Sequence, residues 1–193
     1  MRLALLLLSL LFAAPAAAEP DAKLLAELRQ GGYVLFLRHA STDFSQDDSR
    51  MTSFEDCTTQ RNLTDRGRAE ARALGEHVKR LKIPIGEVLA SPFCRTMETA
   101  RLAFGKARAT GEVRGGPLSA DDPARYAPLR ELLSSKVAQG ENLVIASHGN
   151  PFYATAGAPY LAEGEAAVIR PLGKDFEIVA RVRLDAWRTL AKR

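Results

Sequence analysis

The chain alternates between short apolar runs and longer stretches in which apolar residues recur every three or four positions. Residues 33–37 (YVLFL) and 142–147 (NLVIAS) form nearly continuous apolar runs, which are typical of strands buried on both faces of a parallel sheet. Shorter apolar segments predict further strands at 88–90, 108–113, 166–170 and 176–182. The predicted strands are therefore spread over most of the chain.

Helical periodicity fills the segments between these strands. An apolar stripe runs from Ala71 to Leu81 behind an N-cap at Thr64, and we expect Pro84 to end this helix. Further helices are predicted at 21–30, from Ser91 to Phe104, at 122–139 and at 185–193. Strands that alternate with helices predict one α/β domain of three layers (α/β/α), with a mostly parallel central sheet.

The first 18 residues (MRLALLLLSLLFAAPAAA) stand outside this pattern. A positive charge at Arg2 precedes an apolar run from Leu3 to Phe12, and small residues lead to a predicted cleavage site after Ala18. This order is typical of a secretory signal peptide, and the run is short for a helix that spans a bilayer. We therefore expect a periplasmic or secreted protein whose single domain occupies residues 19–193, without a stable membrane anchor. A retained anchor and a buried N-terminal helix are the alternatives.

Composition and charge narrow the class of protein. The chain is 46% hydrophobic and 26% charged, which excludes disordered, collagen-like and coiled-coil proteins. The net charge is +4, but 27 basic residues are interleaved with 23 acidic ones, so we expect no nucleic-acid partner. The only cysteines are Cys57 and Cys94. In an oxidising compartment we expect them to pair and to tie the long polar loop at 41–60 to the segment around Arg95. Two buried thiols are the alternative.

Basic side chains follow three of the predicted strands, at the point where each strand ends. Arg38 and His39 follow the first strand, Arg95 comes shortly after the second, and His148 follows the run that ends at Ser147. Because the carboxyl ends of parallel strands meet at one edge of a sheet, we expect these side chains to converge.

Two guanidinium groups and two imidazoles suit a phosphoryl group. Guanidinium forks match phosphate oxygens, and a neutral imidazole is a nucleophile that needs no base to activate it. Ser91 is expected to cap a helix whose first amides would also favour an anion. These residues predict attack by one histidine on phosphorus, which gives a phosphohistidine that water then hydrolyses.

Other kinds of site fit the sequence less well. The third histidine, His77, lies in mid-helix among charged residues, and we predict that it is on the surface. No carboxylate or further histidine stands at metal-ligand spacing from His39 and His148, so we expect no metal and no other cofactor. A serine hydrolase at Ser147 is disfavoured because the Gly-x-Ser-x-Gly motif is missing.

Three motifs in chain order resemble those of the histidine phosphatase (phosphoglycerate mutase-like) superfamily. They are Arg38-His39-Ala40, Ser91-Pro92 followed by Arg95 and Thr99-Ala100, and Ser147-His148-Gly149, with Asn62-Leu63-Thr64-x-x-Gly67 as a further similar segment. The resemblance implies a phosphoglycerate mutase-like fold and His39 as the nucleophile. It also implies that Arg38, Arg95 and His148 bind the phosphoryl oxygens. Ala40 stands where the family usually has glycine, and we expect it to be tolerated unless its backbone needs a positive φ.

The general acid that protonates the leaving group is left open. In much of the family it lies in the loop after the third strand, where this chain has Asp121 and Asp122. Because Asp-Asp-Pro is also an ordinary helix start, these aspartates have a structural alternative. Glu163 and Glu165 are the second choice.

The sequence as a whole predicts an exported phosphomonoesterase. Thr42 and Asn150 are expected at the rim of the substrate site. We expect the substrate to be a phosphorylated small molecule or a cell-envelope phosphate, while its identity and the oligomeric state are left open. The alternative is a catalytically inactive protein of the same fold that binds phosphorylated ligands. A phosphoglycerate mutase proper is disfavoured because its substrates are cytoplasmic.

Overall fold

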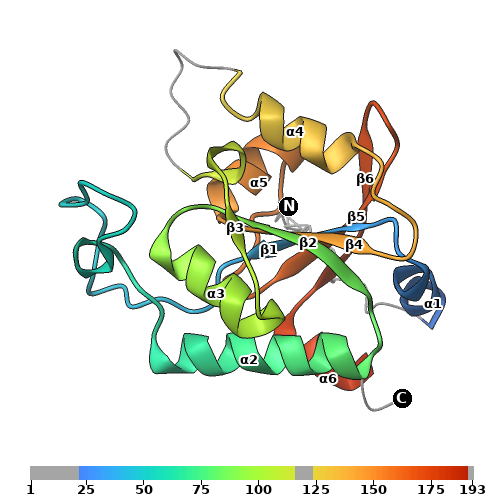
Figure 1. The fold of residues 1–193 in the computed structure, drawn as a ribbon, viewed down its shortest axis with the longest axis horizontal. Coiled ribbons are helices and arrows are strands. Elements are labelled where there is room, and N and C mark those ends of the chain that lie inside the picture. The colour runs from blue at the N-terminus through green and yellow to red at the C-terminus, as the bar shows by residue number, and fades with distance from the viewer. Residues whose placement is uncertain (1–21, 116–123, 191–193) are drawn as a thin grey trace, which may run out of the picture.

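A computed structural model describes residues 22–115 and 124–190 of the chain (Figure 1). The helices are α1 (Ala22–Gln30), α2 (Asp65–Arg80), α3 (Cys94–Phe104), α4 (Ala127–Ser134), α5 (Gly149–Ala156) and α6 (Leu184–Leu190), with short 3-10 turns η1 (Cys57–Thr59) and η2 (Gly111–Val113). The strands are β1 (Val34–Arg38), β2 (Ile85–Ala90), β3 (Arg108–Ala109), β4 (Asn142–Ser147), β5 (Ala166–Pro171) and β6 (Phe176–Val182).

The strands form one six-stranded sheet in the order β3-β2-β4-β1-β5-β6. The four strands from β3 to β1 run parallel to their neighbours, while β5 and β6 close the sheet with antiparallel pairs. This confirms the predicted α/β domain with a mostly parallel sheet. The register aligns the strand ends, because Arg38 is paired with Ser147 and Ala90 with Ala146. Residues that directly follow β1, β2 and β4 therefore leave the sheet at one edge.

Helices cover both faces of the sheet, which makes the three predicted layers. In Figure 1, α2, α3 and α6 lie below the sheet, and α4 and α5 lie above it. Successive residues of β1 point to opposite faces, so Leu35 and Leu37 join the core beneath the sheet with Trp187 of α6. Phe36 joins the other core and packs against Phe152 of α5, with ring centroids 5.2 Å apart.

Several element boundaries differ from the predictions. The predicted N-cap is confirmed, since the Thr64 hydroxyl accepts the amide N–H of Gly67, but α2 ends at Arg80 before Pro84 is reached. The predicted strand at 108–113 is mostly wrong, because β3 has only two residues and a 3-10 turn follows. The helix predicted to reach residue 139 ends at Ser134, where Ser135 turns to an extended backbone. Helix α5 was not predicted.

The prediction that His77 lies on the surface is wrong. His77 is only 8% exposed, and its Nδ1 is buried without a hydrogen-bond partner among the described residues. Helix α6 contacts α2. Burial lowers the pKa of His77, and the charges of Arg80 and, on α6, Arg188 lower it further. The periodicity of an isolated helix cannot show that another helix will cover its polar side.

The predicted signal peptide lies outside the described residues. Within 22–115 and 124–190, no helix combines the length and the apolar character that crossing a membrane requires.

Candidate active site

The sheet edge brings together the four side chains that the sequence singled out. Arg38 ends β1 and His39 follows it, Arg95 lies in the first turn of α3, and His148 precedes α5. The rings of His39 and His148 are 5.4 Å apart between centroids and meet edge to face. Both histidines and Arg95 are buried, and the Arg38 side chain is 16% exposed. The parallel register produces this convergence, because each residue sits at or just beyond a strand end.

The imidazole of His39 is held in one tautomer. Its Nδ1 lies 2.9 Å from the carbonyl oxygen of Ala40, and because a carbonyl can only accept, Nδ1 carries the hydrogen. The Nε2 lone pair is therefore left available. Burial, followed by the charges of Arg95 and Arg38, lowers the pKa of His39 to about 3, against the smaller raising effect of the Ala40 carbonyl. At neutral pH its imidazole is therefore uncharged.

The backbone after His39 is fastened to α3. The Ala40 amide donates to the Thr99 hydroxyl at 3.1 Å, and that hydroxyl donates to the Arg95 carbonyl oxygen at 2.6 Å. Ala40 itself is buried, and Lys82 is the one non-glycine residue with positive φ in the described part of the chain. Alanine therefore fits at this position without backbone strain.

His148 is fixed by contacts from three directions. The Ser91 hydroxyl is 2.8 Å from its Nε2, and the Phe93 ring meets it edge to face at 5.0 Å. A Cβ atom at Gly115 would come within 2.6 Å of its Cδ2, so glycine is required there for close approach. Burial, followed by the charge of His39, lowers the pKa of His148 well below its ordinary value.

The contact between Ser91 and His148 replaces the helix cap predicted from the sequence. Helix α3 begins at Cys94, and its N-cap position is Phe93, which offers no side-chain hydrogen bond. The predicted cap at Ser91 is therefore wrong, because its side chain turns instead toward the neighbouring strand end.

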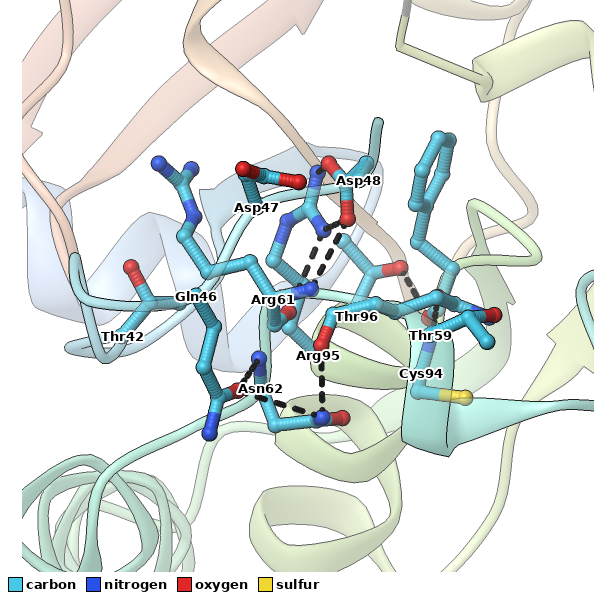
Figure 2. A network of polar contacts seen from close by, with 12 residues as sticks. Thr42, Gln46, Asp47, Asp48, Thr59, Arg61, Asn62, Cys94, Arg95 and Thr96 are labelled. Carbon is cyan, nitrogen blue, oxygen red and sulfur yellow. Dashed lines mark hydrogen bonds and ion pairs between the residues drawn. The ribbon is translucent and has the colours of Figure 1, made fainter. Parts of the chain in front are cut away.

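Each guanidinium group is held at its terminal nitrogens by protein oxygens. The Nη1 of Arg38 donates to the Leu161 carbonyl at 2.7 Å, and its Nη2 lies 3.6 Å from Glu163. Both terminal nitrogens of Arg95 donate to the two carboxylate oxygens of Asp48, at 2.9 and 3.0 Å (Figure 2). The Nε atoms of Arg38 and Arg95 are buried, and within the described residues they have no hydrogen-bond partner. Unpartnered cationic donors of this kind are suited to an incoming anion.

Glu163 lies beside Nδ1 of the His39 ring. One of its oxygens is 3.9 Å from the Nδ1 of His39 and accepts the Thr42 hydroxyl at 2.7 Å. Thr42 is thus a buried partner of Glu163 rather than a rim residue. Glu165 is bound through both oxygens to Arg181, at 3.0 and 3.1 Å.

Of the remaining predicted site residues, the structure describes only Asn150. Asn150 is exposed at the start of α5, and its side-chain oxygen accepts the hydroxyl of Tyr160. Asp121 and Asp122 lie outside the described residues.

The sequence analysis did not identify Asp48 or Arg61 as site residues, although it identified the polar loop that carries Asp48. Nothing in the order of residues indicates which of the acidic side chains in that loop reaches Arg95.

Cys57 and Cys94 form a disulfide, as predicted. It joins the loop that carries Asp48 to the first residue of α3, directly before Arg95. Two neighbouring contacts act in the same place: the Gln60 side chain accepts the Cys94 amide at 2.9 Å, and the rings of Phe54 and Phe93 are 5.1 Å apart. The loop is thereby anchored beside the site.

As for metal ligands, no group of three His, Cys, Asp or Glu side chains in residues 22–115 and 124–190 could hold an ion.

Comparisons with known proteins give a family-model match and similar folds. Residues 34–116 match the family model of the histidine phosphatase superfamily (branch 1). Among solved structures, the chain is similar to the protein histidine phosphatase SixA complexed with tungstate, with a TM-score of 0.53 and 20% identity over 79% of this chain and 97% of that one.

Two other solved structures extend the likeness in fold. A mycobacterial glucosyl-3-phosphoglycerate phosphatase in complex with inorganic phosphate gives a TM-score of 0.57, with 17% identity over 79% of this chain and 97% of the other. Phosphoglycerate mutase from Bacillus anthracis gives a TM-score of 0.58, with 12% identity over 86% of this chain and all (100%) of the other. No curated protein matches the sequence.

Proposed function

We propose that this chain, which belongs to the histidine phosphatase superfamily, hydrolyses a phosphomonoester through a phosphohistidine intermediate on His39, without a metal ion. The observation that carries the proposal is the state of His39. Its imidazole is uncharged and buried, its Nδ1–H is held by the Ala40 carbonyl, and two arginines and a second histidine surround it. An imidazole held in this way combines a free lone pair with cations that attract a phosphoryl dianion.

In the first step, the Nε2 of His39 forms a bond to phosphorus while the bond from phosphorus to the ester oxygen breaks. The leaving oxygen takes a proton from a carboxylic acid, which we assign to Asp121 or Asp122. In the second step, water attacks phosphorus, the phosphorus–nitrogen bond breaks and inorganic phosphate is released. The carboxylate formed in the first step accepts the proton of that water. Arg38, Arg95 and His148 stabilise the charge on the equatorial oxygens.

The geometry of the two glutamates argues against their acting as this acid. Glu163 lies on the Nδ1 side of the His39 ring, whereas the leaving group departs from phosphorus bound to Nε2. Glu165 is engaged by Arg181 through both oxygens. A carboxylate 3.9 Å from Nδ1 is instead placed to balance the positive charge that the imidazole gains when Nε2 is phosphorylated.

The proposal is tested with the purified domain, p-nitrophenyl phosphate and the variant His39→Ala. We expect hydrolysis that resists EDTA, its loss in the variant, and an acid-labile phosphoryl group on His39 when the reaction is quenched. Equal rates of phosphate release by both proteins would refute the mechanism. Binding of phosphate with no turnover on any ester would favour the alternative, a catalytically inactive protein that binds phosphorylated ligands.

We also place the protein outside the cytoplasm, in the periplasm or secreted, after cleavage behind Ala18. The disulfide between Cys57 and Cys94 supports this location, because structural disulfides persist in oxidising compartments. A phosphorylated small molecule or a cell-envelope phosphate would then be the substrate. Mass spectrometry of the protein from the periplasm tests the location: we expect an N-terminus at Glu19, and an intact Met1 would contradict it.

A further inference from the structure

The contact between Asp48 and Arg95 has no part in the reaction steps above. Arg95 has five N–H groups, and the end of its guanidinium is filled by Asp48 and, at 3.3 Å from Nη1, by the carbonyl of Arg61. What is left unengaged is the hydrogen on Nε and the second hydrogen on Nη2. These two lie on the same edge of the planar group and form a second fork. That edge is the part of Arg95 able to bind a phosphoryl group while Asp48 stays in place.

Asp48 is itself held firmly enough to orient its partner. The amide of Arg61 donates to one of its carboxylate oxygens at 2.9 Å. No residue from 43 to 59 is buried, so this loop has no apolar core of its own to fix it. Three of its attachments lie at the start of α3: the disulfide, the Gln60 contact and the Asp48–Arg95 pair. Arg95 therefore takes part in one of the contacts that fasten the loop.

Arg38 shows a similar arrangement. The Leu161 carbonyl and the carboxylate of Glu163 hold the terminal nitrogens of Arg38. The Nε of Arg38, like that of Arg95, is buried and has no partner within the described residues. Both arginines are therefore anchored at the end and unengaged at Nε.

We propose that Asp48 is a positioning residue, which holds Arg95 by its end so that the edge carrying Nε binds the phosphoryl group. The inference rests on the proposed function, since it assumes that Arg95 binds phosphate. The opposite role would follow if phosphate had to displace Asp48, because the carboxylate in the guanidinium fork would then compete with the ligand. The two roles predict opposite effects of removing the charge of Asp48.

The experiment is a double-mutant cycle on phosphate binding. The dissociation constant of inorganic phosphate is measured by calorimetry for the wild type, Asp48→Asn, Arg95→Gln and the double variant, and kcat and KM are measured on p-nitrophenyl phosphate. We expect Asp48→Asn to weaken phosphate binding about tenfold and to lower kcat/KM by at least as much, because a misdirected donor loses a charge-assisted bond. In the Arg95→Gln background the same substitution should change neither quantity, since the residue through which Asp48 acts is then missing.

Asp47→Asn is the matched control. Asp47 is adjacent and exposed, and within the described residues its carboxylate accepts hydrogen bonds from Ser49 alone, at 2.8 and 2.5 Å. This variant removes the same charge from the same loop and should bind phosphate like the wild type. The near-ultraviolet circular dichroism of each variant shows whether it is folded. Asp48→Glu, which keeps the charge, is expected to recover part of the affinity.

Four results would overturn the inference: tighter phosphate binding by Asp48→Asn, unchanged binding by Asp48→Asn, an equal loss in the Arg95→Gln background, or an equal loss in Asp47→Asn. The failure of the proposed function looks different. In that case Arg95→Gln would bind phosphate as well as the wild type does. If Arg95→Gln loses phosphate but Asp48→Asn does not, only the role of Asp48 is wrong.

Discussion

Removal of the disulfide should lower the stability of the folded protein by an amount that follows from its place in the chain. Cys57 and Cys94 are 37 residues apart in sequence. A cross-link that closes a loop of this size lowers the entropy of the unfolded chain and stabilises the fold by about 4 kcal/mol on the chain-entropy model. For a domain of this length, such a change lowers the melting temperature by roughly 8 to 16 °C.

The structure indicates that little native packing is lost with the disulfide. Cys57 is exposed and Cys94 is half-buried, and neither belongs to the two large cores of the domain. The segment between them contains α2 and β2, which keep their own core contacts. The disulfide should therefore stabilise the fold mainly through the unfolded state. Without the disulfide the loop at 43–59 would also gain freedom in the folded protein, which would make the loss of stability somewhat smaller.

The assay is thermal unfolding of the wild type and of the double variant Cys57→Ser/Cys94→Ser, with and without a reducing agent. We expect the reduced wild type to melt at the temperature of the double variant, and the reducing agent to leave that variant unchanged. A difference of less than about 1 kcal/mol between oxidised and reduced wild type would refute the entropic reasoning.

Three further predictions concern the site. The pKa of His39 is about 3 in the folded protein and near 6.5 in the unfolded chain, so only the unfolded chain takes up a proton as the pH falls through that interval. The free energy of unfolding should therefore decline there by up to about 1.4 kcal/mol per pH unit, and a plot of melting temperature against pH should be flatter in His39→Gln. Glu163→Gln should lower the rate of phosphohistidine formation about tenfold or more in rapid-quench experiments, whereas Glu165→Gln should affect mainly the melting temperature; equal rate losses would contradict the placement of Glu163 beside Nδ1. Gly115→Ala should displace the His148 ring and weaken phosphate binding about tenfold in calorimetry, and unchanged binding would show that the ring is not held by this contact.

The predictions that succeeded depend on short-range patterns. A run such as 142–147 is apolar because both of its faces are covered, and the strand has those bounds in the structure. The cap at Thr64 is a local interaction between residues three apart, so it too could be predicted. The pairing of the cysteines followed from their number and from the expected compartment.

The predictions that failed depend on partners distant in sequence. Ser91 has the chemistry of an N-cap, but a histidine from another strand end binds its hydroxyl. His77 stands among charged residues, yet it is buried on α2, against which α6 packs. In both cases a tertiary contact outweighed a correct local preference.

The sequence by itself determined the class of fold, the sheet edge and the kind of chemistry, because strand ends and residue types are written in order along the chain. The tertiary structure alone decided how these groups are held. It placed Asp48 on Arg95 across 47 positions and Glu163 beside His39 across more than a hundred. It also set the tautomer of His39 and depressed its pKa. Such properties depend on burial and on distances between charges, and these exist only once the chain has folded.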